Sequence, residues 1–232
     1  LRVPLDIPHR RVDLGQRKRI MSSRWYARAA AMGDACMGNV REPAVAGLFY
    51  HATAGRLGDQ VEQYIDRKAE KREVIAIVSP HAGLMYSGAV AGAVYSRMIL
   101  PDIFIVLGPN HRGVGSQASI MSSGSWATPL GEVTIDSPLA ERLKHHCSKL
   151  REDAQAHKME HSLEVQIPFM QFFSREVKIV PIALKDLDFE TCKSLGEAIS
   201  TSIRETTEKV VVVASTDMTH FEPQESAKRK DQ

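Results

Sequence analysis

Cysteine is scarce in this sequence. Cys36, Cys147 and Cys192 are the three cysteines among 232 residues, and no two of them form a CxxC pair. An odd number of widely spaced cysteines is not typical of a disulfide framework or of a thiolate zinc site. We therefore predict a protein of a reducing compartment, the cytoplasm.

Long hydrophobic runs and a strong charge imbalance are also missing. No apolar run approaches the roughly 20 residues that a membrane-spanning helix requires. The formal net charge is only +2, and no basic face interleaved with aromatic residues appears. We therefore expect a soluble protein that binds neither a membrane nor nucleic acid.

Familiar motifs for nucleophilic catalysis and nucleotide binding are absent. The chain contains no GxSxG nucleophile elbow, and "HAGLMYSG" matches neither GxGxxG nor GxxxxGK[ST]. Ser79 and Ser215 each end an apolar run, but neither has the context of a catalytic serine. The sequence thus disfavours a serine hydrolase and a nucleotide-binding protein.

After Arg41, strand-like and helix-like segments alternate along the chain, which is the order of βαβ units. This order predicts an α/β fold with a mostly parallel or mixed sheet, and the β-branched strands suggest burial on both faces. A Ser, Gly and Thr-rich stretch at 116–131 predicts a loop or irregular hairpin. We expect strands at 74–79, 103–107, 177–184 and 210–215, and helices at 55–68, 87–98, 137–150 and 189–206.

The ends of the chain differ from its middle. Residues 1–40 are rich in Arg and Ala and lack a secretory h-region, so we expect a poorly ordered leader there. The chain begins with Leu and ends in the charged "SAKRKDQ". These features predict one domain at 41–232 that is incomplete at its carboxyl end.

Three of the predicted strands run into a histidine: His81, His111 and His220. A single histidine in a turn is more often an ordinary polar side chain than a ligand. However, ligands bind beyond the carboxyl ends of the strands in an open α/β sheet, where loops from several strands converge. We therefore expect these loops to share one functional site.

A fourth histidine, His161, follows Glu160 at the start of a helical pattern. Glu160 is explained by the helix N-terminal dipole, but His161 is not. Pro168 interrupts this pattern and predicts a kink or a restart of the helix.

Imidazole is a ligand for iron, copper, zinc and nickel, and histidine changes charge near neutral pH. We expect His81 and His111 to bind a metal, and His161 and His220 to act as acid and base. Asp217, three residues before His220, is expected to orient that imidazole.

Four ordered segments, "SPHAGLMYSGAVAGAVY", "LGPNHRG", "EHSLEVQIPFMQ" and "ASTDMTHF", resemble the Memo family, which includes the prokaryotic AmmeMemoRadiSam system protein B. "REPAVAGLFYHA" is similar to the family's opening segment, so the resemblance extends from Arg41 to Gln232. It implies a three-layer α/β/α fold similar to that of class III extradiol ring-cleaving dioxygenases. It also implies iron or copper at His81 and His111, and acid–base roles for the other two histidines.

The resemblance leaves the third metal ligand open. Memo-like proteins place a cysteine in a "CG" segment near the carboxyl terminus, where the dioxygenases have a carboxylate, and this chain ends before that segment. Asp217 and Glu160 are the alternatives within the chain, and the sequence selects neither. The family's genomic association implies a radical-SAM protein and an AMMECR-type protein as partners.

Three functions stay open on the sequence. The first is a metal-dependent oxidoreductase related to extradiol dioxygenases, acting on an unknown small molecule. The second is a non-enzymatic adaptor that binds a metal or a peptide, with Trp126 and Phe221 as aromatic walls of its cleft. The third is an incomplete gene product without activity.

Overall fold

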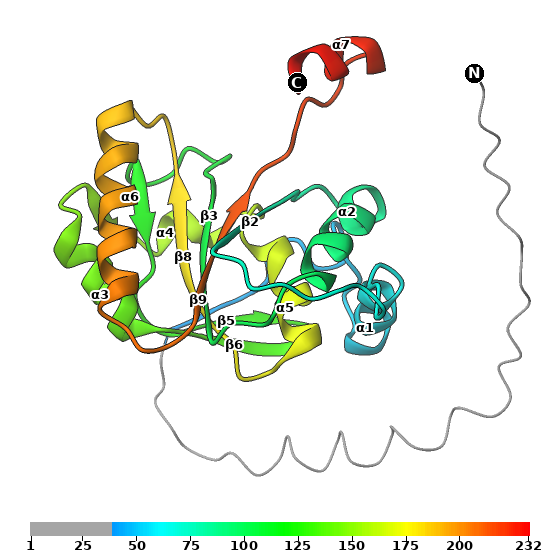
Figure 1. Ribbon diagram of the computed structural model, residues 1–232, viewed down its shortest axis with the longest axis horizontal. Helices are drawn as coiled ribbons and strands as arrows, with labels where there is room; N and C mark the ends of the chain where they lie inside the picture. The colour runs from blue at the N-terminus through cyan, green and yellow to red at the C-terminus, as the bar shows by residue number, and fades with distance from the viewer. Residues whose placement is uncertain (1–38) are drawn as a thin grey trace, which may run out of the picture. The chain divides into compact units, whose positions relative to one another are not determined.

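The computed structural model describes residues 39–232, which form an α/β domain around a mixed, mostly parallel sheet of nine strands (Figure 1). Seven strands follow each other in the order β1-β5-β6-β8-β3-β9-β2, and β4 and β7 join beside β8. The strands are β1 Val40–Arg41, β2 Ala76–Ser79, β3 Ile103–Pro109, β4 Ala118–Ile120, β5 Ser125–Thr128, β6 Gly131–Ile135, β7 Leu150–Glu152, β8 Lys178–Leu184 and β9 Val210–Ser215. The α/β class and the largely parallel sheet are as predicted.

Strands β2, β9, β3 and β8 lie side by side and parallel. Ser79 is in register with Ser215, and Leu107 is in register with Ala214. The carboxyl ends of β2, β9 and β3 therefore meet at one edge of the sheet, and the segments that leave these strands begin there.

Helices cover both faces of the sheet because an interior strand, β3, is apolar on both sides. Phe104 and Val106 belong to the core that packs against α1, α2 and α5, whereas Ile103 and Ile105 belong to the core beneath α3 and α6. The helices are α1 Ala54–Glu62, α2 Leu84–Ser96, α3 Ser137–His146, α4 Gln155–Lys158, the 3-10 helix η1 Glu164–Gln166, α5 Ile167–Phe173, α6 Phe189–Arg204 and α7 Gln224–Lys230.

Local sequence signals set several of these boundaries. Asp136 caps α3 by accepting a hydrogen bond from the Leu139 N–H at 2.9 Å, and Asp188 caps α6 through the Thr191 N–H at 2.7 Å. Pro168 occupies the first turn of α5, directly after η1, so the predicted restart of the helix is confirmed.

One sequence prediction is confirmed in part and another needs correction. In the stretch 116–131, predicted as a loop or irregular hairpin, β5 pairs with β6 as an antiparallel hairpin, but the stretch also contains the strand β4. Burial on both faces holds for β3 and β8 but not for β2, where Val78 is 61% exposed. The reason is position, because β2 lies at the end of the strand order and α3 and α6 pack over β8 and β3 instead.

The predicted leader, residues 1–40, lies outside the described residues except for Asn39 and Val40. Among residues 39–232, no helix combines the length and the apolar character that crossing a bilayer demands.

A buried ion pair ties the first strand to the segment that carries His161. The Arg41 guanidinium pairs with the Glu164 carboxylate and donates hydrogen bonds to the carbonyls of His157 at 3.0 Å and Glu160 at 2.7 Å. It also lies 4.2 Å from the centre of the buried Trp126 ring. Every part of this cation is therefore engaged.

The Glu164 carboxylate has further donors of its own. It accepts hydrogen bonds from the backbone N–H groups of Ala44 at 2.8 Å and Val45 at 3.1 Å, and from the Tyr50 hydroxyl. A buried charge is tolerated when hydrogen bonds satisfy it in this way. The network thus fixes the segment 157–164 against the amino-terminal part of the domain.

We predict that Arg41→Met lowers the free energy of unfolding by about 3–5 kcal/mol, because the Glu164 carboxylate would stay buried without its counter-charge. Arg67→Met is the matched control, since Arg67 pairs with Glu62 at 2.7 Å on the exposed surface. It should cost about 1 kcal/mol or less. Equal losses in chemical denaturation of the two variants would contradict the role of the buried pair.

His157 adds a pH dependence to the same region. Burial, and then the positive charge of Arg41, lower the pKa of His157 from 6.5 to about 4. Below pH 6.5 the unfolded chain binds a proton at this ring that the folded protein does not bind, so stability falls between pH 6.5 and 4. His157→Gln should remove about 3 kcal/mol of this acid-induced loss. The exposed His145→Gln variant, measured by denaturation across the same pH range, should keep it.

Candidate metal centre

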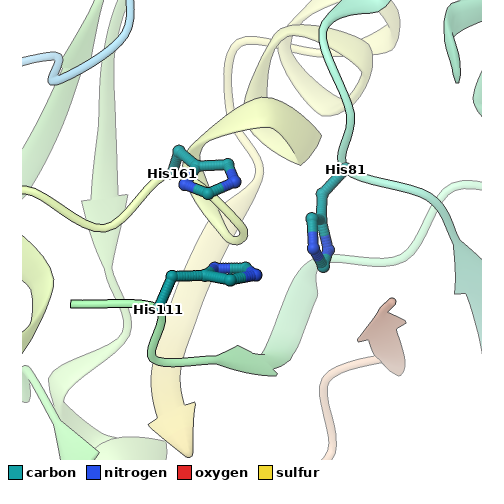
Figure 2. Close-up of side chains that lie close together, drawn as sticks. All are labelled: His81, His111 and His161. Carbon is teal, nitrogen blue, oxygen red and sulfur yellow. The ribbon is translucent and has the colours of Figure 1, made fainter. Parts of the chain in front are cut away.

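Three histidines from separate segments meet at the carboxyl edge of the sheet (Figure 2). His81 follows β2, His111 follows β3, and His161 lies between α4 and η1. The centre of the His81 ring lies 5.2 Å from that of His111 and 5.7 Å from that of His161. The rings of His111 and His161 stack with their centres 4.5 Å apart. The parallel strands therefore bring together imidazoles that are far apart in the sequence.

The three imidazoles fit a metal ion by their donor chemistry and spacing. One nitrogen of each ring lies within 4.8 Å of the others. An ion bound about 2 Å from each nitrogen needs them roughly 3–4 Å apart, a difference that small side-chain rotations close. A set of three imidazoles suits iron, copper, zinc or nickel.

A buried carboxylate, Glu160, binds the ring of His111 and the backbone of the segments that carry His111 and His161. Its Oε1 accepts hydrogen bonds from His111 Nδ1 at 2.9 Å and from the N–H groups of His161 at 2.9 Å and Ser162 at 2.8 Å. Its Oε2 accepts one from the His111 N–H at 2.6 Å. Because a carboxylate only accepts, His111 Nδ1 carries a hydrogen, and Nε2 is the nitrogen that holds the lone pair in the neutral form of this ring.

Asp217 binds the backbone of the segment that carries His81. Its Oδ1 accepts hydrogen bonds from the N–H groups of His81 at 2.7 Å and Ala82 at 3.2 Å, and its Oδ2 lies 3.8 Å from His81 Nε2. Glu160 is fully engaged by four N–H donors, whereas Asp217 Oδ2 lies beside the cluster. Of the two alternative carboxylates, Asp217 is therefore the one with an oxygen left beside the imidazoles.

Burial favours the uncharged form of two of these imidazoles. It lowers the pKa of His81 and of His161, although Asp217 opposes the shift at His81 and Glu160 opposes it at His161. At Glu160, burial acts to raise the pKa, but the hydrogen bonds from His111 and Ser162 together hold it below its ordinary value. Neutral rings beside an ionised carboxylate are the state in which histidine binds metals.

The predicted acid–base residue His220 is not part of this cluster. Its ring is exposed, and its Nδ1 donates a hydrogen bond to the carbonyl of Met218 at 2.8 Å. The structure thus brings His81, His111, His161 and Asp217 together and places His220 elsewhere. The acid–base roles of His220 and His161 stay predictions.

Trp126 does not form a wall of an open cleft, as the adaptor hypothesis expected. Its side chain is fully buried beneath Arg41. Phe221, the other expected wall, is fully exposed and has a positive φ of 61°. Trp126 was predicted wrongly because a tryptophan in a Ser and Gly-rich stretch looks like a surface residue, whereas it lies in β5.

Sequence reasoning missed several residues that support the site. Glu160 was explained by a helix dipole or kept open as a metal ligand, whereas in the structure it binds two histidine-bearing segments. Ser215 and Gln166 hydrogen-bond to each other beside His81 and were given no role. The adjacency of Glu160 to His161 was a usable signal, but nothing in the sequence marks Gln166.

Comparison with known proteins places the chain among relatives of one family. Residues 41–232 match the family described as Memo-like protein. The chain is 41% identical over 205 residues to a MEMO1 family protein of Pyrobaculum aerophilum, covering 83% of this chain and 73% of the relative. It is 43% identical over 204 residues to one of Caldivirga maquilingensis (82% and 72%), and 44% identical over 192 residues to one of Archaeoglobus fulgidus (83% and 72%).

We predict that Glu160→Gln lowers the free energy of unfolding by about 1–3 kcal/mol at pH 7, because an amide cannot accept all four hydrogen bonds. Because the pKa of Glu160 is lowered in the folded protein, the difference in stability between the two proteins is present at neutral pH and disappears as the pH falls through that pKa. The exposed Glu197→Gln variant on α6 should show neither effect. A pH-independent difference in denaturation would rule out an ionised Glu160.

Proposed function

The chain belongs to the Memo-like protein family, and on that basis we propose that it is a metal-dependent oxidoreductase with iron or copper held by His81, His111 and His161. The observation that carries the proposal is the convergence of these three imidazoles at the carboxyl edge of parallel strands. The sequence motifs imply a likeness to class III extradiol dioxygenases, and this likeness is part of the proposal.

When bound, iron or copper supplies Lewis acidity and one-electron redox chemistry. The residues of the chain prepare the site for it. Glu160 holds the Nδ1 hydrogen of His111, which leaves Nε2 for the metal, and Asp217 contributes a negative charge beside His81. His111 is 41% exposed on its side chain, so a substrate reaches the site from this side.

Two roles are open to His161: a metal ligand or an acid–base residue. Its ring stacks on His111 and contacts the Phe49 ring at 4.7 Å, which holds it within the cluster as a third ligand. The sequence suggested an acid–base role for it instead. Radical-SAM and AMMECR-type proteins, which the resemblance implies as partners, also belong to this proposal.

The first test is the metal content of protein purified without added metal. We predict about one iron or copper per chain for the unaltered protein and for the control His145→Ala, whose histidine lies exposed on α3. The His81→Ala/His111→Ala double variant should contain almost none, because two of three ligands are lost. Equal metal in the double variant and the control would overturn the proposal.

A second measurement separates ligand from acid–base residue. Protein loaded anaerobically with Fe(II) is exposed to oxygen and candidate catechols, and oxygen uptake is recorded. If His161→Ala loses its metal, His161 is a ligand; if it keeps the metal but loses turnover, His161 moves protons. Turnover by the His81→Ala/His111→Ala variant equal to that of the unaltered protein would contradict an enzymatic role for the site.

A further inference from the structure

The hydroxyl of Ser215 occupies a buried position behind the metal centre. Ser215 is the last residue of β9 and is 2% exposed. Its Oγ has three neighbours within hydrogen-bond distance: the Ser162 carbonyl at 2.6 Å, Gln166 Nε2 at 2.9 Å and His81 Nδ1 at 3.1 Å. A serine hydroxyl has one hydrogen to donate and two lone pairs with which to accept, so these three contacts use its full capacity.

The direction of each hydrogen bond follows from the chemistry of the partners. The Ser162 carbonyl only accepts, so the hydrogen of Ser215 points to it. Both remaining contacts of Ser215 must then be bonds that its oxygen accepts.

Gln166 confirms this direction through its own contacts. Its Nε2 lies 2.9 Å from the Pro80 carbonyl, which requires an N–H donor, and its Oε1 accepts a hydrogen bond from the Tyr95 hydroxyl at 3.1 Å. The amide is therefore oriented with its NH2 group toward Ser215. Tyr95 is itself fixed by stacking on Phe169 at 5.3 Å.

One contact of Ser215 remains, and His81 Nδ1 has to donate it. We propose that Ser215, held by Gln166 and Ser162, is a positioning residue that locks His81 in the Nδ1–H tautomer and reserves Nε2 for the metal. This inference rests on the proposed metal function for its purpose, but the tautomer itself is a property of the metal-free protein.

The contact between Ser215 and His81 has the composition of a nucleophile and its general base, and the hydrogen directions exclude that pairing. A general base would accept the serine hydrogen at Nδ1, whereas here the Ser215 hydroxyl donates that hydrogen to the Ser162 carbonyl. The serine is also too buried for a substrate to reach. Ser215 thus takes at His81 the part that Glu160 takes at His111.

The test is the tautomer of His81 in metal-free protein with 15N-labelled histidine. A long-range 1H–15N spectrum at neutral pH distinguishes the protonated ring nitrogen from the unprotonated one, and His81→Ala identifies the signals. We expect Nδ1–H. An Nε2–H ring, or a mixture in which it is the larger part, would overturn the inference without any substitution at Ser215.

Three variants assign the effect to the hydroxyl. Ser215→Ala should raise the Nε2–H population, and Ser215→Thr, which keeps a hydroxyl, should restore Nδ1–H. Ser79→Ala is the matched control, because Ser79 is in register with Ser215 on β2 and its buried Oγ makes no hydrogen bond within residues 39–232. An unchanged His81 tautomer in Ser215→Ala would contradict the proposed role.

Binding of Co2+ to the same proteins separates this inference from the proposed function. The Kd for Co2+ should rise about 10–100-fold in Ser215→Ala and stay unchanged in Ser79→Ala. If the unaltered protein binds no Co2+, the metal function fails while the spectrum still decides the tautomer. If Co2+ binds with His81 in the Nε2–H form, the metal function stands and the role of Ser215 fails.

Discussion

The buried carboxylate of Glu160 is the interaction on which the site depends. It is fully enclosed, and its four hydrogen bonds join the segment after β3 to the segment before η1. Without it, His111 would have no fixed ring orientation and His161 would lack the turn that presents it. An ionised group inside a protein is stable only when hydrogen bonds satisfy all of its polar atoms. The geometry of the site and the local fold therefore depend on the same contacts.

A second buried charge network supports the first from the opposite side. Arg41 donates to the Glu160 carbonyl and pairs with Glu164, so the segment between these two glutamates is held at both ends. The histidine cluster is thus positioned by polar contacts in the interior. Ser215 and Gln166 extend the same principle to His81.

The sequence allowed the sheet edge to be predicted, because parallel apolar strands must end together and His81 and His111 directly follow two of them. It did not allow the position of His220 to be predicted. The strand before His220 ends at the same edge, but the chain then carries the imidazole to the surface. The β-branched content of β2 also led to a wrong prediction of burial on both faces, since the exposure of a strand depends on whether helices cover it. Gln166 could not be predicted as a support because Tyr95, Pro80 and Ser215, its partners, lie tens of residues away, whereas Glu160 lies next to His161 and its contact with His111 is the distant one.

The central claim is that three imidazoles hold one metal ion, and anomalous diffraction from crystals grown with Co2+ tests it most directly. We predict a single strong anomalous peak within coordination distance of nitrogen atoms of His81, His111 and His161, with Nε2 as the donor of the first two. A peak that contacts fewer than two of these rings, or no peak at this edge of the sheet, would contradict the account.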